Sequence, residues 1–314
     1  MTTQHILIQR APMGVSLQDA GRSGYLRFGV SAAGPMDWAR HEMANRMLGK
    51  PAASTAIEVG PAGLGLSLDE GELQISFAGP GFVLKLDERS LSGPVRAVLR
   101  AGQRLEIIPQ RGAMWGYLGF LADLKLPALL GSQAENSVSR LSVKQIRAGV
   151  RLGIVSKPLI QPACQQFMDP FIIEESSPIG ILPSSQYDHF SEEMKAALIE
   201  NPVSIANRYD RMAYRLENVR LISEQGHDIL SDGVTMGAIQ VPGDGRPFIL
   251  MADHQPTGGY PKIACVCKAD LPRLAQMSPG RAFELAWLNL DLATHRWQST
   301  QKQLESLAAL KGTQ

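Results

Sequence analysis

Polar side chains that could bind or activate a small molecule are concentrated in one stretch of the sequence, MADHQPTGGYPKIACV (251–266). Within ten residues this stretch holds Asp253, Gln255, Thr257, the pair Gly258-Gly259, Tyr260 and Lys262. Such a density of polar groups is typical of a loop that either turns a corner or holds a ligand. The glycines fit both interpretations, because they permit a positive φ and also a close approach of backbone to a ligand.

Further polar residues precede this stretch and fall at the ends of expected strands. They are Asp232, Gln240 and Asp244. Because strand ends meet at the mouth of a β-barrel, we expect these side chains to gather there with Asp253 and Gln255. His254 is the only histidine within a dense polar motif, and it is either a direct participant or a structural residue.

A second cluster lies in VSLQDAGRSGYLRFGVSAAGPMD (15–37), where an expected strand gives way to a glycine loop. One interpretation is structural: Asp19 pairs with Arg22 to order the loop, and Asp37 caps the helix that follows. The other is functional. Gln18 offers a donor and an acceptor, and Arg22 can grip a carboxylate in a planar fork, so the loop would form an edge for an anionic or amide ligand.

A third polar segment, NRYDRMAYRLEN (207–218), has the alternation of a half-buried strand after Asp210. The alternation places Tyr214 on the buried face and Arg211 on the other. An exposed strand face with arginines is usually only solvated charge. Arg211 gains a functional role only if its face lines a cleft.

Several signatures of enzyme chemistry are missing. The sequence has no Gly-x-x-x-x-Gly-Lys-Ser/Thr phosphate loop, no Gly-x-Ser-x-Gly elbow and no His-x-x-x-His metal pair. We interpret Cys164, Cys265 and Cys267 as reduced and structural, because no histidine or second cysteine pair lies at ligand spacing. Any chemistry must therefore use positioned carboxylates, amides, Arg and Lys, without a bound metal.

Composition narrows the class of partner. The 31 basic and 30 acidic residues give no surplus of positive charge for nucleic acid. No apolar run approaches the roughly 18 residues of a membrane span, and the start, MTTQHILIQR, lacks the plan of a secretion signal. We therefore expect a cytoplasmic protein that binds a small molecule or another protein, with no nucleic acid and no membrane.

The elements that must position these residues are mainly β-strands. The 30 glycines and 20 prolines recur between short apolar runs. Predicted strands cover 73–79, 82–86, 104–108, 114–122, 219–223, 237–241 and 247–252. A turn that feeds a strand recurs in RAGQRLEII (100–108), RAGVRLGIV (147–155) and SPGRAFELAW (278–287), so similar β units are expected in both halves.

Helices are few. Their signals predict a helix within 34–50, a second from a Ser191 cap to before Pro202, one or two turns after Asp270, and a last helix over 295–311. The proline-rich segment around 156–178 indicates a domain boundary. We therefore divide the chain into an N-terminal β lobe (1–155), a linker (156–178), a C-terminal β lobe (179–292) and a C-terminal helix (293–314).

Long motifs along the chain resemble one known family. They are LQDAGRSGY (17–25), IEVGPAGLGL (57–66), YDRMAYRLE (209–217) and the run from LSDGVTMGAIQVPGDGRPFILMADHQPTGGYPKIACV to ADLPRLAQMSPG. This pattern is similar to the carboxyltransferase subdomain A/B family. The family includes the C subunit of 5-oxoprolinase, proteins called allophanate hydrolase subunit 2, the sporulation regulator KipA, and the carboxyltransferase region of urea carboxylase.

The resemblance implies a mainly β protein with two cyclophilin-like β-barrel lobes and a few short helices. It also implies work with companion A and B subunits, the latter KipI-like, on a small amide or lactam. An amide needs an acceptor facing its N–H and a cation or N–H facing its C=O. By motif, the catalytic residues would be Asp253, Gln255 and Lys262. The substrate-binding residues would be Gln18, Asp19, Arg22, Arg211, Asp232, Gln240, Thr257, Gly258, Gly259 and Tyr260.

Three functions stay open on this basis. The leading one is an ATP-dependent, 5-oxoprolinase-type hydrolase that opens 5-oxoproline to glutamate, with ATP on a partner subunit and no cofactor on this chain. The others are a biotin-dependent carboxyl transfer to urea or a related amide, and a non-catalytic KipA-like binding protein. The sequence departs from the family pattern at Ala213, Ser184-Ser185, Pro256 and 133–136, all in expected site loops, which allows a shifted substrate.

Overall fold

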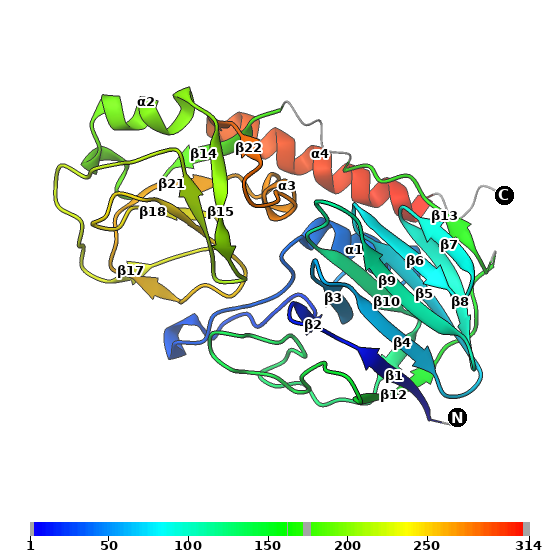
Figure 1. Ribbon diagram of the computed structural model, residues 1–314. Helices are drawn as coiled ribbons and strands as arrows, with labels where there is room; N and C mark the ends of the chain where they lie inside the picture. The colour runs from blue at the N-terminus through cyan, green and yellow to red at the C-terminus, as the bar shows by residue number, and fades with distance from the viewer. Residues whose placement is uncertain (1–2, 162, 172–176, 310–314) are drawn as a thin grey trace.

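The computed structural model describes residues 3–161, 163–171 and 177–309. Figure 1 shows two β bodies joined by a long C-terminal helix. We call the part built on strands β1 to β13 the N-terminal half and the part built on β14 to β23 the C-terminal half. The predicted mainly β fold with barrel-like sheets is confirmed.

The N-terminal half contains a seven-stranded and a six-stranded antiparallel sheet. The first has the order β11-β12-β1-β4-β9-β6-β7, with β1 (Gln4–Arg10), β4 (Leu64–Leu68), β6 (Phe82–Leu86), β7 (Arg89–Ser92), β9 (Arg104–Pro109), β11 (Ala122–Leu124) and β12 (Arg151–Ser156). The second has the order β13-β8-β5-β10-β3-β2, with β2 (Val15–Gln18), β3 (Ala56–Val59), β5 (Glu72–Ala78), β8 (Val95–Arg100), β10 (Gly116–Phe120) and β13 (Gln165–Gln166).

The C-terminal half is an eight-stranded sheet with a small ribbon beside it. The sheet has the order β22-β15-β16-β19-β18-β21-β14-β23, with β14 (Ile179–Pro183), β15 (Val203–Tyr209), β16 (Ala213–Glu217), β18 (Ala238–Gln240), β19 (Phe248–Leu250), β21 (Lys262–Val266), β22 (Ala282–Phe283) and β23 (Leu285–Trp287). The ribbon pairs β17 (Asp232–Gly233) with β20 (Thr257–Gly258). All pairs in the sheet are antiparallel except β14 with β23.

The four predicted helices are present, but the last one begins at residue 290, before the predicted 295, and two short 3₁₀ helices were not predicted. The described helices are η1 (Leu26–Phe28), α1 (Trp38–Met47), η2 (Tyr187–His189), α2 (Glu192–Glu200), α3 (Leu271–Ala275) and α4 (Leu290–Ala309), where η marks a 3₁₀ helix. Asp37 caps α1 by accepting the backbone N–H of Arg40 at 3.0 Å, and Ser191 caps α2 by accepting that of Met194 at 3.3 Å. Each cap satisfies a donor that a helix N-terminus leaves free. No helix in the described ranges is long and apolar enough to cross a membrane.

One predicted strand is wrong. Residues 219–223 form a loop, although Leu221 is fully buried there. Asn218 has a φ of 69°, which ends β16, and Ile222 is 71% exposed. The apolar run therefore reflects one buried anchor, and not a strand face.

The predicted linker is partly structured. Within 156–178, Gln165–Gln166 pairs with β8 as β13, and residues 162 and 172–176 lie outside the described residues. The three turn-and-strand repeats do feed strands: Gly102, Gly149 and Gly280 lie in turns with φ of 83°, 85° and 74°. The domain division itself stays a prediction.

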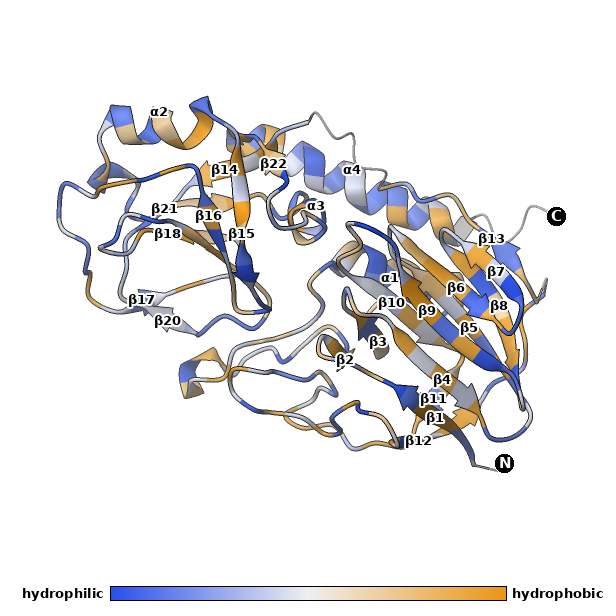
Figure 2. Cartoon of the chain, in the orientation of Figure 1, coloured by the Kyte–Doolittle hydropathy of each residue, from blue (hydrophilic) through white to orange (hydrophobic). Residues whose placement is uncertain are grey.

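A continuous hydrophobic core joins the halves. The core includes Met43, Met47 and Trp115 from the N-terminal half and Tyr214, Ile239 and Leu274 from the C-terminal half. A separate core fills the space between the two N-terminal sheets, where the strands alternate hydrophobic and hydrophilic residues (Figure 2). Because side chains of both halves pack in one core, we expect the halves to hold a fixed relative position.

Helix α4 belongs to the shared core, and this gives a testable consequence. Leu304 is fully buried within it. Leu304→Ala should lower the free energy of unfolding by about 2–5 kcal/mol, because it leaves a cavity. Gln298→Ala, at an exposed position of the same helix, should change it by less than about 0.5 kcal/mol. Denaturant unfolding measures both, and equal effects would show that α4 is not docked as described.

Candidate functional site

The centre of the candidate site is an ion pair between two loops of the C-terminal half. Arg211 lies in the turn between β15 and β16, and Asp253 follows β19. The Arg211 guanidinium donates to both carboxylate oxygens of Asp253, from Nε at 3.1 Å and from Nη2 at 2.9 Å. This two-point geometry is the strong, orienting form of an Arg–carboxylate contact. Arg211 therefore does not lie on the exposed strand face that the alternation predicted.

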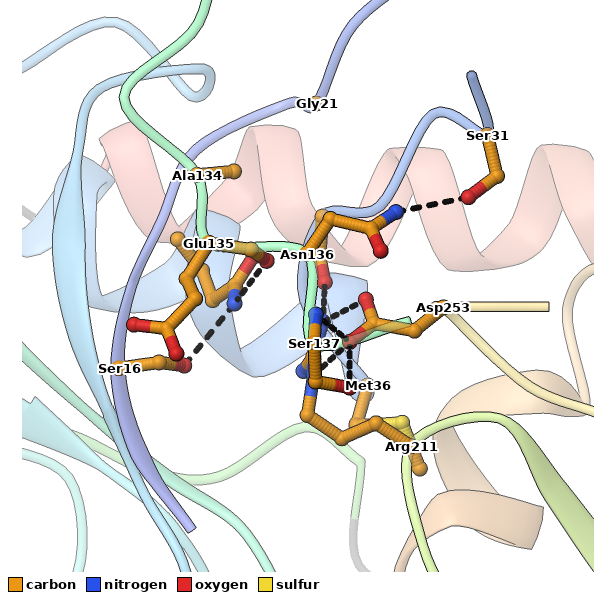
Figure 3. A network of polar contacts seen from close by, with 12 residues as sticks. Ser16, Gly21, Ser31, Met36, Ala134, Glu135, Asn136, Ser137, Arg211 and Asp253 are labelled. Carbon is orange, nitrogen blue, oxygen red and sulfur yellow. Dashed lines mark hydrogen bonds and ion pairs between the residues drawn. The ribbon is translucent and has the colours of Figure 1, made fainter. Parts of the chain in front are cut away.

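The N-terminal half completes this arrangement (Figure 3). Arg211 also pairs with Glu58 of β3 and donates to the carbonyl of Gly34 at 2.6 Å. Ser137 donates to Asp253 Oδ2 from its backbone N–H at 2.9 Å and from its hydroxyl at 2.7 Å. We call Glu58, Ser137, Arg211 and Asp253 the bridge. Its four side chains tie the two halves together.

The charged side chains of the bridge are almost completely buried, so each charge depends on the others for its stabilisation. Glu58 and Asp253 are 0% exposed and Arg211 is 8% exposed. Burial raises the pKa of Glu58, and Arg211 opposes that rise. Burial alone would lower the pKa of Arg211, but Glu58 and Asp253 raise it above its ordinary value. The Arg211 guanidinium thus compensates the negative charge of two buried carboxylates, Glu58 and Asp253.

Glu58 also accepts hydrogen bonds from other residues of the N-terminal half. Its Oε2 accepts the backbone N–H of Met36 at 2.9 Å and the hydroxyl of Tyr117 at 2.8 Å. The Tyr117 oxygen in turn accepts the backbone N–H of Asp37 at 2.7 Å. Asp37 accepts the side chain of Gln276, from the C-terminal half, at 2.8 Å. A chain of buried hydrogen bonds therefore runs from the bridge to the cap of α1.

The loop that supplies Ser137 is fastened by Asp19. The Asp19 carboxylate accepts the Ser132 hydroxyl at 2.6 Å, the Gln133 N–H at 2.7 Å and the Gly21 N–H at 2.8 Å. Asp19 makes no ion pair with Arg22 in the described structure, so that interpretation is wrong. The Ser132 hydroxyl and the backbone N–H groups of Gln133 and Gly21 therefore already supply hydrogen bonds to the Asp19 carboxylate.

Arg22 is the most unusual charged group near the bridge. It is 1% exposed, and it donates to two backbone carbonyls, Leu129 O at 3.1 Å and Ala134 O at 2.5 Å. Its Nη1 atom is buried and has no hydrogen-bond partner in the described part of the chain. A buried guanidinium without a carboxylate contact is costly, because burial disfavours the charged form. Burial accordingly lowers the pKa of Arg22.

Gln18 lies beside Arg22 and also keeps one polar atom free. Its amide nitrogen donates to Glu135 O at 3.1 Å and to the Ser16 hydroxyl at 2.9 Å. The amide oxygen is buried and has no hydrogen-bond partner among the described residues. Gln18 and Arg22 bond to the carbonyls of consecutive residues, Glu135 and Ala134, so both contact the same short segment of the loop. Together they offer one charged donor and one acceptor.

The remaining predicted residues form a second cluster in the C-terminal half. Lys262 is 4% exposed, and its amine donates to Asp232 at 2.7 Å. Gln240 donates to Tyr260 O at 3.3 Å, while its own amide oxygen and that of Gln255 are buried and have no hydrogen-bond partner among the described residues. A Cβ at Gly258 would lie 2.5 Å from the Gln240 amide nitrogen, so a larger residue there would displace that side chain.

The other members of this cluster have mainly backbone roles. Thr257 and Gly258 pair with β17, and the carbonyl of Gly259 accepts the N–H of Ile229 at 2.8 Å. Tyr260 is 38% exposed and stacks edge-on against Phe248. His254 contacts the carbonyl of Gln255 at 2.7 Å, and burial lowers its pKa.

The predicted residues fall into separate hydrogen-bonded groups, and a single mouth that gathers them stays a prediction. Among the described residues, no hydrogen bond or ion pair joins the bridge to the cluster around Lys262. Along the chain, β20 lies between Asp253 and Lys262. Asp244 lies apart from both, in an exposed pair with Arg215.

Three residues of the arrangement were not identified from the sequence. Glu58 lies within IEVGPAGLGL and Ser137 follows 133–136, but neither stretch indicates which residue the side chain would contact. Tyr117 lies in an apolar strand and gave no signal at all. The isolated charge of Glu58 between Ile57 and Val59 on a buried strand could have marked it, because such carboxylates need a partner.

The Lys262–Asp232 contact can be tested by titration. Hydrogen bonding from Lys262 holds the pKa of Asp232 below its ordinary value. Lys262→Met should therefore raise the pKa of Asp232 toward the value of a free aspartate, as measured by NMR of its carboxyl carbon. Lys157→Met, which removes the partner of Asp123 instead, should leave Asp232 unchanged. An unaltered Asp232 titration in Lys262→Met would contradict the contact.

Comparison with known proteins decides the family. The sequence profile described as "Carboxyltransferase domain, subdomain A and B" matches residues 28–287. The chain belongs to this carboxyltransferase family. Among family members, the C subunit of 5-oxoprolinase from Escherichia coli (strain K12) is 30% identical over 304 residues, which is 96% of this chain and 97% of that protein. The protein of the same name from Haemophilus influenzae is 32% identical and covers 88% of this chain and 89% of its own length.

Larger proteins match this chain over part of their length. Urea amidolyase of Saccharomyces cerevisiae is 25% identical over 322 residues, but the match covers only 17% of that enzyme. The crystal structure of TTHA0988 superposes with a TM-score of 0.81 at 28% identity, over 91% of this chain and 56% of that one. The Kluyveromyces lactis urea amidolyase structure, at 21% identity and a TM-score of 0.86, shares the fold over 96% of this chain and 20% of that one.

Proposed function

We propose that this chain is the C subunit of a 5-oxoprolinase-type hydrolase that opens a lactam with companion A and B subunits. The observation that carries this proposal is the extent of the similarity. Two relatives named as the C subunit of 5-oxoprolinase match over nearly their whole length, whereas the urea amidolyase match covers a sixth of that protein. The similarity to the first kind of protein therefore spans most of both chains, and this extent favours the 5-oxoprolinase assignment.

The geometry beside the bridge supports a lactam acid as substrate. 5-Oxoproline presents a carboxylate, a ring carbonyl and a ring N–H. The free Nη1 of Arg22 would bind the carboxylate, and the free oxygen of Gln18 would accept the N–H. Both groups are buried and hydrogen-bonded to backbone carbonyls of the same loop, so little ordering is needed when the ligand binds.

The bridge has a different role in this proposal. All four contacts to the Asp253 carboxylate come from Arg211 and Ser137, which leaves it poorly placed to act as a base. We therefore assign Asp253 and Arg211 to positioning: they hold residues 134–137 of one half against the other. Gln255 and Lys262 stay candidates for contact with substrate or with a companion protein.

ATP is assigned to a companion subunit, because this sequence has no phosphate loop. The second candidate is carboxyl transfer to urea or a related amide, which the urea amidolyase similarity favours. That reaction requires a biotin carrier, and this chain contains no Ala-Met-Lys-Met biotinylation sequence. Biotin would then be supplied by another protein.

The decisive experiment measures ADP release when 5-oxoproline is added to the three subunits together. Release that requires both the lactam and this chain supports the proposal. If a stable complex forms but releases no ADP with 5-oxoproline, the proposal is wrong, and urea with a biotin carrier is the next substrate to assay. A complex inactive with both would favour the KipA-like binding role.

A further inference from the structure

A cavity separate from the bridge lies between helices α1 and α4. Its volume is about 280 Å³. It is lined by Ala20, Pro35, Trp38, His41, Glu42, Ala52, Ala53, Lys268, Trp297 and Gln301. Drug-sized ligands usually occupy roughly 300–1,000 Å³, so this cavity suits a smaller molecule. We call it the tryptophan pocket.

Two indole rings dominate its wall. Trp38 of α1 and Trp297 of α4 are in contact, with ring centroids 5.0 Å apart and planes inclined by 53°. Both rings remain partly exposed. Trp38 donates its indole N–H to the carbonyl of Lys268 at 3.2 Å, so the polar atom of this ring is already satisfied. The Trp38 ring therefore presents apolar surface, which is suited to another flat or apolar group.

The lining contains one lysine, Lys268, and one acid, Glu42. The amine of Lys268 lies 4.2 Å from the centre of the Trp297 ring and forms no ion pair in the described part of the chain. Glu42, the acid in the lining, is paired with Arg46 at 2.6 Å. Burial lowers the pKa of His41 to about 4, so this ring is neutral near pH 7. An unpaired ammonium beside apolar rings favours a ligand with one negative charge.

We propose that the tryptophan pocket binds a small ring-containing carboxylate, with the ring on Trp38 and Trp297 and the carboxylate on Lys268. Binding in this pocket does not depend on the proposed function, whereas its coupling to Gln18 and Arg22 rests on it. It assigns a second ligand site, formed by helices from opposite ends of the chain.

The pocket borders the backbone that supports the bridge. Ala20 follows Asp19, and Pro35 lies between Gly34, which accepts from Arg211, and Met36, which donates to Glu58. His41 contacts the carbonyl of Gln18 at 3.1 Å. A ligand in the pocket thus stabilises residues 18–22 and 34–37 in one arrangement. We expect its occupancy to alter ligand affinity at Gln18 and Arg22, and the coupling must be reciprocal.

Phenylacetate is a suitable probe, because it joins a flat ring to a carboxylate, and phenylacetamide is its neutral analogue. Titration calorimetry on the full chain should show saturable phenylacetate binding that is weakened about tenfold or more by Lys268→Gln, as expected for loss of a charged contact. Phenylacetamide should bind equally to both proteins. Lys302→Gln, at an exposed lysine of α4, is the matched control and should bind like wild type.

A second variant tests the cavity itself. Ala53 is exposed at the mouth, so Ala53→Trp should fill the pocket and abolish binding of both probes while thermal stability is kept. Hydrogen exchange should slow at residues 18–22 and 34–37 when phenylacetate binds. Absence of saturable binding, or binding that Lys268→Gln and Ala53→Trp leave unchanged, overturns the site. Binding without slower exchange overturns the coupling.

Discussion

Arg211→Met should be the most destabilising substitution in this protein, with a loss of about 3–5 kcal/mol in the free energy of unfolding. The change removes the single cation of the bridge, so the buried Glu58 and Asp253 carboxylates keep their hydrogen bonds but have no positive charge beside them. Its effect should exceed that of any cavity of similar size, because an unpaired buried charge costs more than lost packing. Urea unfolding followed by tryptophan fluorescence measures it.

Arg215→Met is the matched control. Arg215 is close in sequence and pairs with Asp244 at 3.0 Å, but both side chains are more than 40% exposed. Exposed pairs contribute little, so this variant should lose less than about 1 kcal/mol. If Arg211→Met lost no more than Arg215→Met, the bridge would not hold the halves together as described.

The loss of unfolding free energy in Arg211→Met should depend on pH, and this dependence is an independent check that the loss is electrostatic. Burial raises the pKa of Glu58 and Arg211 opposes that rise, so the substitution should raise it further. A carboxyl group with a folded pKa above its unfolded pKa stabilises the fold at low pH and loses that contribution as pH rises through the folded pKa. The deficit relative to wild type should therefore be largest near neutral pH and shrink toward about pH 5. A deficit independent of pH would place the loss in packing instead of charge.

Local signals in the sequence identified most elements but few of the contacts. Asp37 and Ser191 could be recognised as caps, because a cap depends only on the next three residues. Residues 219–223 were misassigned because an apolar run does not distinguish a strand from a loop with one buried anchor. That distinction depends on Asn218, whose left-handed backbone ends the pairing.

The site required information that no local pattern contains. Arg211 is separated from Asp253 by 42 residues, Ser137 from Asp253 by 116, and Glu58 from Arg211 by 153. These side chains meet only because the two halves pack through one core. Motif similarity named Arg211 and Asp253 individually, but it could not show that they bind each other, or that Lys262 lies in another cluster.

Substitution of Arg22 should impair ligand binding and hardly change stability, whereas substitution of Arg211 should mainly lower stability. If Arg22 binds the substrate carboxylate, Arg22→Met should raise KM for 5-oxoproline in the three-subunit assay about 100-fold, within the range for loss of a buried charged contact. The neutral lactam 2-pyrrolidinone, which has the same ring without the carboxylate, should be affected much less. The preference of the enzyme for 5-oxoproline over 2-pyrrolidinone should therefore be largely lost.

Stability should change little in the same variant. Arg22→Met loses two hydrogen bonds to backbone carbonyls, but it also removes a buried charge that has no carboxylate contact. These effects oppose each other, so the free energy of unfolding should shift by less than about 1.5 kcal/mol. Arg22→Lys keeps the charge and should recover part of the preference for the acid. If both lactams lost activity equally in Arg22→Met, or if the fold weakened as in Arg211→Met, the guanidinium would be holding the 129–137 loop, and the substrate carboxylate would bind elsewhere.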